Sequence, residues 1–141
     1  MSVAIFENKK SGLRDRLKLK KYLIYIGKKE NTLFSSLNII FCSDDELLSI
    51  NKDFLQHDYY TDIITFDLTE TGEIKKTAEL YISIDRVRNN AISYNSSIKK
   101  ELHRVIFHGV LHLCGFKDKK EKDIKLMRQK EDEYLRHYFK E

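Results

Sequence analysis

The segment Lys99–Cys114 restricts the possible folds of this 141-residue chain more than any other segment does. Its apolar residues recur at helical spacing and form one stripe, which consists of Leu102, Val105, Ile106, Val110, Leu111 and Leu113. A helix with such a stripe buries it against another element of the fold. The segment therefore predicts a long helix that packs into the protein core.

Four shorter segments have the apolar pattern of β-strands. They are Val3–Glu7, Leu37–Cys42, Asp62–Leu68 and Glu79–Ile84. Further helices are expected at Leu13–Lys29, after a capping box at Ser43–Glu46, at Arg86–Tyr94 and at Lys119–Phe139, the last with Ile124, Met127, Tyr134 and Leu135 facing inward. No repeat or linker interrupts this order. We therefore predict a single α+β domain over residues 1–141, in which helices cover a small sheet of about four strands.

The composition limits where such a chain can work. With 41% hydrophobic and 34% charged residues, it fits a folded globular domain and not a disordered chain. No apolar run approaches the roughly 20 residues that span a bilayer, and the first residues lack the features of a signal peptide. Cys42 and Cys114 are the only cysteines and are expected as free thiols. We therefore expect a cytoplasmic protein with no membrane association and no disulfide-linked partner.

Charge is distributed unevenly along the chain. Basic residues outnumber acidic ones in residues 1–30, and acidic residues outnumber basic ones in residues 31–116. This distribution suits a polyanionic partner together with a cation-binding centre. For the charge pattern alone, the simpler interpretation of solvated helix faces is favoured.

The segment from His108 to Asp118 carries the residues with the most specific chemistry. His108 and His112 lie four positions apart, so their imidazoles share one face of the predicted helix and can bind one metal ion. Gly115 can end this helix in a left-handed conformation, and the chain can then fold back to bring Asp118 to the same ion. Zinc commonly takes three protein ligands and keeps one position for water. The sequence therefore predicts one zinc ion per chain on the penultimate helix.

Other interpretations of these residues remain open. Cys114 and His103 point about 200° and about 140° away from the two histidines around the helix, whereas His57 and His137 lie on other elements. Asp118-Lys119-Lys120-Glu121 also has the spacing of a capping box, so Asp118 is either a helix cap or a ligand. A glycine at position 109 would allow either a substrate or the sheet to approach the helix closely.

Gly109 also bears on the reaction class. Zinc proteases of the His-Glu-x-x-His type place a general-base Glu at the position that Gly109 occupies here. This argues against a peptidase or amidase, which stays as an alternative zinc hydrolase. RNA hydrolysis does not need that Glu, because the 2′-hydroxyl is an internal nucleophile and a metal can activate water or stabilise phosphorane charge.

Three segments together resemble the YbeY family of bacterial endoribonucleases. His108–Phe116 resembles the family pattern His-Gly-x-Leu-His-Leu-x-Gly-Tyr-Asp-His. Asn51, Phe54 and Asp58, followed by Thr61–Phe66, resemble its Asn-rich turn and its Thr-Asp-Val-Leu-Ser-Phe strand. Ala78–Ser83 resembles its Gly-Asp-Ile-x-Ile-Ser strand. The resemblance covers about residues 37–118 in the family's order.

The resemblance implies a fold, an activity and partners. The implied fold is a mixed sheet flanked by helices, with a single zinc ion at the mouth of a basic cleft. The implied activity is metal-dependent, single-strand-specific endoribonuclease cleavage in ribosomal RNA maturation, notably at the 3′ end of the small-subunit RNA, and in ribosome quality control. The implied partners are ribosomal RNA and the ribosome or ribosomal proteins.

Two positions depart from the family pattern. Asp118 stands where the family has its third His, which adds an anion to the site and shifts metal preference toward harder ions. Leu55 stands where the family has an Arg, and a guanidinium there would clamp phosphate. This loss motivates a further alternative, a ribosome-associated assembly factor with a structural or vestigial zinc. His57, Arg86 or Arg88 are candidate substitutes for the missing charge, although each is more simply a surface residue. Thr61 and Asp62 are expected to make turn or cap hydrogen bonds.

Overall fold

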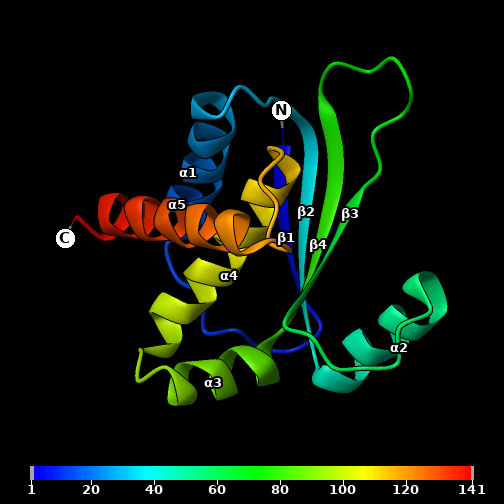
Figure 1. Ribbon diagram of the computed structural model, residues 1–141, viewed down its shortest axis with the longest axis vertical. Coiled ribbons are helices and arrows are strands. Elements are labelled where there is room, and N and C mark those ends of the chain that lie inside the picture. Colours follow the sequence, from blue (N-terminus) through cyan, green and yellow to red (C-terminus); the bar gives the residue numbers. More distant parts are fainter. Residues whose placement is uncertain (1, 141) are drawn as a thin grey trace.

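The computed structural model describes residues 2–140 and confirms the predicted α+β fold with a mixed four-stranded sheet (Figure 1). Its elements in chain order are β1 (Ser2–Glu7), α1 (Arg16–Lys29), β2 (Phe34–Cys42), α2 (Asp44–Leu55), β3 (Ile63–Asp67), β4 (Lys76–Ser83), α3 (Ile84–Ser93), α4 (Ile98–Leu113) and α5 (Glu121–Phe139). The strand order is β1-β2-β4-β3, with β1, β2 and β4 parallel and β3 antiparallel to β4. The predicted domain runs over residues 1–141, and its two end residues lie outside the described part.

The core lies on one face of the sheet. Helices α1, α4 and α5 lie on that side, and α2 lies on the opposite side near one end (Figure 1). Alternation along the two central strands places Leu37, Ile39 and Phe41 of β2 and Leu80 and Ile82 of β4 in the core. Helix α4 packs into this core with the stripe that the sequence predicted, because each of those six apolar residues is buried. This stripe therefore packs α4 into the core beside the sheet.

Two helices differ from the sequence expectation, α1 in its start and α5 in its inward face. Helix α1 begins at Arg16, after Asp15 in a left-handed conformation, so Leu13 precedes the helix. Met127, Tyr134 and Leu135 of α5 are buried as predicted, but Ile124 is 50% exposed, so the prediction for Ile124 is wrong. Ile124 lies in the first turn of α5, where the helix borders a cavity beside α4.

Several local predictions are confirmed. The Ser43 hydroxyl accepts a hydrogen bond from the Glu46 amide at 3.1 Å, and the Glu46 carboxylate accepts one from the Ser43 amide at 3.3 Å. This is the capping box that starts α2. Cys42 and Cys114 are both free thiols. Between residues 2 and 140, no helix combines the length and the apolar character that crossing a membrane requires.

Candidate metal centre

Three side chains converge at the C-terminal end of α4. His108 and His112 lie one turn apart, with ring centroids separated by 4.5 Å. The Oδ2 atom of Asp118 lies 3.3 Å from Nε2 of His108 and 3.2 Å from Nε2 of His112. The ligand atoms of the three residues all lie within 4.8 Å of one another. The structure thus brings together the three residues that the sequence predicted as metal ligands.

Gly115 directs Asp118 to the two histidines. Its φ of +102° lies in the left-handed region, and an added Cβ would meet no atom within 4 Å. Glycine is therefore favoured here by backbone conformation and not by space. The Gly115 amide donates to the His112 carbonyl at 3.0 Å, and the Phe116 amide donates to the Leu111 carbonyl at 3.1 Å. These bonds end α4 and turn the chain back over the histidine face.

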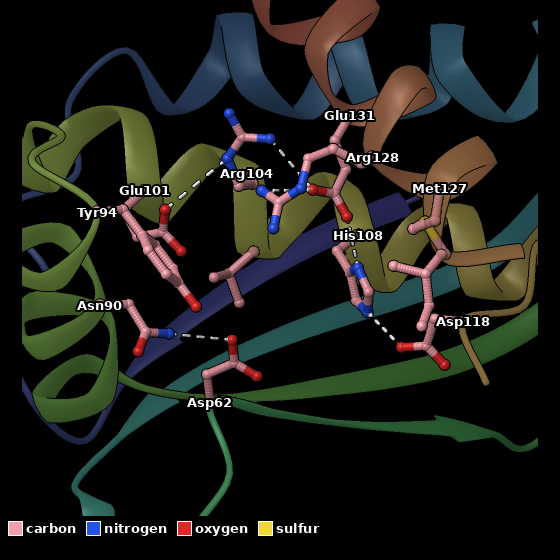
Figure 2. Close-up of a pocket in the computed structure, with 12 residues that line it drawn as sticks. Asp62, Asn90, Tyr94, Glu101, Arg104, His108, Asp118, Met127, Arg128 and Glu131 are labelled. Carbon is pink, nitrogen blue, oxygen red and sulfur yellow. Dashed lines mark hydrogen bonds and ion pairs between the residues drawn. The ribbon is translucent and has the colours of Figure 1, made fainter. Parts of the chain in front are cut away.

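The alternative role of Asp118 as a helix cap is wrong. Helix α5 begins at Glu121, and the residue at its N-cap is Lys120, which makes no side-chain capping bond. The Asp118 carboxylate instead points toward His108 (Figure 2). The capping-box spacing is present in the sequence, but the helix starts too late to use it.

Each histidine is oriented by a second hydrogen bond. His112 Nδ1 lies 2.9 Å from the Phe116 carbonyl oxygen, and His108 Nδ1 lies 2.6 Å from Oε2 of Glu131. A carbonyl or carboxylate oxygen accepts, so we assign the ring proton to Nδ1 in both cases. This leaves the Nε2 lone pairs free toward Asp118. Two imidazole nitrogens and one carboxylate oxygen are a donor set that fits zinc, and the outer bonds are of the type that fixes metal-binding histidines.

Glu131 belongs to a buried charge network. It is 4% exposed, and its Oε1 accepts from Arg104 at 3.2 Å. Arg104 also donates to Asp132 at 2.8 Å. Burial by itself lowers the pKa of His108, but the hydrogen bond and the negative charge of Glu131, together with Asp118, outweigh it and raise that pKa. The network therefore places negative charge directly behind the His108 ring.

The other histidines and Cys114 do not belong to this group. His103 is buried against the rings of Tyr138 and Phe139 and bonds the Lys99 carbonyl. His57 stacks on Tyr59, and His137 contacts Tyr22. Within the described part of the chain, the only group of three or more potential ligands is His108, His112 and Asp118.

Gly109 serves the packing of α4 on the sheet. A Cβ at this position would lie 2.6 Å from Cδ1 of Ile63 and 2.9 Å from Cδ2 of Leu80. Of the two expectations for Gly109, the structure therefore confirms close approach of the sheet. This contact sets the distance between the histidine face of α4 and strand β3.

Two cavities meet at the candidate centre, and His108, Asp118 and Asp62 line both. The smaller cavity has a volume of about 360 Å³ and lies between α3, α4 and α5 (Figure 2). The larger, of about 690 Å³, runs beside β3 and the loop that follows α2. The smaller cavity is lined by four carboxyl side chains and two guanidinium groups, so this side of the centre is not the basic cleft that the resemblance implied.

The larger cavity contains Leu55, which stands where the family pattern has an Arg. Leu55 lines it together with His112, and so does His57. Asn51 fixes the loop here, because its side-chain amide donates to the Tyr59 carbonyl at 2.9 Å. Arg86 is instead bound to Asp44 at 2.8 Å.

Arg88 is exposed on α3, and neither it nor Arg86 lines either cavity. Among the three candidate substitutes for the missing guanidinium, only His57 therefore lies in the larger cavity. Thr61 also lines this cavity, and its hydroxyl donates locally to the Ile63 carbonyl at 3.5 Å.

Three residues around the centre were missed in the sequence. Glu131 follows Met127 by four positions and precedes Leu135 by four, so an acid interrupts the inward face of α5. Glu101 lies seven positions before His108 and therefore on the same face of α4. Arg104 links these two acids. Glu101 and Glu131 could have been found in the sequence, because each is a charged residue at a position where the helix pattern predicts burial.

Fold and site together define a class, a small α+β protein with a candidate two-histidine, one-carboxylate metal centre on its central helix. The sequence profile described as Endoribonuclease YbeY matches residues 6–139 of the chain. The chain is 53% identical over 124 residues to Endoribonuclease YbeY of Cytophaga hutchinsonii, which covers 87% of this chain and 85% of that relative. Its identity to Endoribonuclease YbeY of Flavobacterium psychrophilum is 50% over 107 residues, covering 76% and 75%.

A solved structure agrees with these relatives. The solution structure of TM1509 from Thermotoga maritima matches with a TM-score of 0.68 and 33% sequence identity, over 98% of this chain and 89% of that one. The chain belongs to the YbeY family.

Proposed function

We propose that this chain is a zinc-dependent endoribonuclease that cuts single-stranded segments of ribosomal RNA. One observation carries the proposal: the Nε2 atoms of His108 and His112 both face one carboxylate oxygen of Asp118, at 3.3 and 3.2 Å. The matching family is described as an endoribonuclease, and this convergence is the one group in the described chain with the donor set of a metal centre. We infer one zinc ion per chain, held by these three residues.

The chain's own residues contribute orientation and charge to such a reaction. When bound, zinc would supply Lewis-acid activation of water and stabilisation of charge on the scissile phosphate. Glu131 and the Phe116 carbonyl hold the two imidazoles in the orientation that exposes Nε2. Lys119 lines the larger cavity beside the centre, and so does Lys76, which is paired with Asp67 at 2.7 Å. The ammonium group of Lys119 suits the phosphates of an RNA strand that approaches along β3.

The substrate and partners follow from the family resemblance. We infer action in the maturation of the 3′ end of small-subunit ribosomal RNA and in ribosome quality control. The proposed partners are ribosomal RNA and the ribosome or ribosomal proteins. This substrate implies a cytoplasmic location.

The test is cleavage of an end-labelled single-stranded RNA that contains the 3′ region of small-subunit ribosomal RNA, beside the same RNA annealed to its complement. We expect cleavage of the single strand only, loss of cleavage on chelation, and loss in His112→Ala. His137→Ala is the matched control, because His137 lies away from the centre, and it should cleave like the parent. Undiminished cleavage by His112→Ala would contradict the proposal. A parent that binds zinc but cuts no RNA would favour an assembly factor.

A further inference from the structure

The smaller cavity has the size and the position of a substrate subsite. Its volume of about 360 Å³ lies within the range of about 300–1,000 Å³ of ligand pockets. Figure 2 shows His108 and Asp118 toward one end of this cavity, and it shows Asn90, Tyr94 and Glu101 toward the other end. A strand held at the metal centre would therefore have a neighbouring nucleotide within reach of this cavity.

The far end of the cavity presents a carboxylate that has no hydrogen bond. Glu101 is only 3% exposed, yet among the described residues its side chain makes no hydrogen bond, and its one ion pair is to Arg104 Nε at 3.8 Å. Asp62, beside it in the cavity lining, accepts from the Asn90 amide at 3.3 Å and from the backbone N–H groups of Asp62 and Ile63. A ligand that donates N–H groups would bond Glu101 and the remaining lone pairs of Asp62.

Two other ligand classes fit this cavity less well. A phosphate would meet four carboxyl groups against two guanidinium groups, and Arg104 is already bound by Glu131 and Asp132. A second metal ion would need three ligand atoms close together, and no such set occurs in the described chain outside His108, His112 and Asp118. A neutral ligand with N–H donors meets neither objection.

The walls of the cavity suit a flat ring. Val105, Ile124 and Met127 form its apolar lining, and the Tyr94 ring, 60% exposed, stands at its edge. Single-stranded RNA is recognised by stacking unpaired bases on aromatic side chains and by hydrogen bonds to their Watson–Crick edges. Guanine displays an imino N–H and an amine side by side, whereas uracil displays a single N–H between two carbonyl groups.

We propose that this cavity is a base pocket that receives one unpaired base of the RNA substrate and prefers guanine. Asp62 and Glu101 accept its N–H groups, and Tyr94 stacks on the ring. The inference rests on the proposed endoribonuclease function and adds a base preference to it. Cleavage should therefore concentrate at a fixed distance from guanine in single-stranded RNA.

The first test compares three single-stranded RNAs that differ at one base, which is guanine, inosine or uracil. Inosine lacks only the exocyclic amine. We expect kcat/KM for cleavage near that base to be about tenfold lower with inosine, and lower again with uracil. Glu101→Gln should reduce the guanine-to-inosine ratio of kcat/KM, because Glu101 is proposed to accept from the N–H groups of guanine. Tyr94→Ala should reduce the guanine-to-uracil ratio, because a purine stacks on the ring over a larger area, whereas Tyr94→Phe, which keeps the ring, should retain it. Equal kcat/KM for the three RNAs in the parent would overturn the base pocket while leaving the endoribonuclease proposal intact.

A binding measurement separates the two proposals. Guanosine 3′-monophosphate should shift the NMR signals of the Asn90 side-chain amide and the Tyr94 ring at lower concentration than inosine 3′-monophosphate does. If the parent cuts no RNA but this difference is found, the activity proposal fails and the pocket stands. If neither nucleotide shifts those signals, the pocket proposal fails.

Discussion

The Nδ1 atom of His108 lies 2.6 Å from a carboxylate oxygen of Glu131, which comes from another helix 23 positions later in the chain. Glu131 is buried and is bound on its other side by Arg104. The contact connects His108, the first of the three candidate ligands, to α5, which packs against α4. The position of the His108 ring thus depends on the tertiary fold and not on α4 alone.

Replacing Glu131 should weaken metal binding without removing a ligand. In Glu131→Gln, the side-chain shape is kept but the negative charge behind His108 is lost, so we expect zinc affinity to fall by about 10- to 100-fold. Competition with a chromophoric chelator measures this. Asp132→Asn is the matched control, since Asp132 also binds Arg104 but does not touch His108. Equal affinities in the parent and Glu131→Gln would show that Glu131 has no part in orienting the ligand.

A side chain at position 109 should weaken the packing of α4 on the sheet. The Cβ of Gly109→Ala would lie 2.6 Å from Ile63 Cδ1, and such overpacking costs about 1–3 kcal/mol of unfolding free energy, of which the higher helix propensity of alanine offsets about 1 kcal/mol. Denaturant unfolding of the metal-free protein measures the loss. Adding Ile63→Val removes the Cδ1 atom and should restore part of the stability. A Gly109→Ala variant as stable as the parent would mean that α4 can move away from the sheet at no cost.

Glu101 should make stability depend on pH. Burial raises the pKa of Glu101 from 4.5 to about 6. A carboxyl whose pKa is raised on folding stabilises the folded state most below its unfolded pKa, and that contribution is lost as pH rises through about 6. Glu101→Gln lacks this titration. The unfolding free energy of Glu101→Gln, taken relative to that of the parent, should therefore rise by about 1–2 kcal/mol from pH 4.5 to pH 7.5. A difference that stays constant over this range would contradict the assignment.

The absence of an arginine at position 55 should limit the rate of RNA cleavage. Leu55 lines the larger cavity together with His112, so the guanidinium of Leu55→Arg would stand beside the candidate centre and bind phosphate. We expect kcat/KM for RNA cleavage to rise by about tenfold. Leu55→Gln, a polar but uncharged change, should leave it near the parent value. A Leu55→Arg variant with unchanged or lower activity would mean that the missing guanidinium is not limiting.

The helices and strands were predictable where a periodic pattern coincided with a cap or a glycine. The stripe of α4, the capping box at Ser43 and the turn at Gly115 each follow from local sequence, and each is present in the structure. The start of α5 was predicted two residues early, because the spacing after Asp118 matched a cap that the helix does not use. Local spacing could not show that Asp118 faces the histidines, since that depends on how the chain turns after α4.

The two candidate histidine ligands were predictable from spacing, but their surroundings were not. His108 and His112 share a face in any regular helix. Glu131 and Asp62 reach the site only through the packing of α5, and of the segment that enters β3, around α4, which no local pattern specifies. The position of Ile124 at the cavity, and not in the core, has the same cause.

The central claim is that His108, His112 and Asp118 hold one metal ion, and elemental analysis of the purified protein tests it most directly. The parent, Asp118→Ala and the control Glu121→Ala, which changes an exposed acid at the start of α5, would be purified in parallel. We expect about one zinc per chain in the parent and in Glu121→Ala, and clear loss in Asp118→Ala. Equal zinc in all three proteins, or no metal in the parent, would contradict the claim.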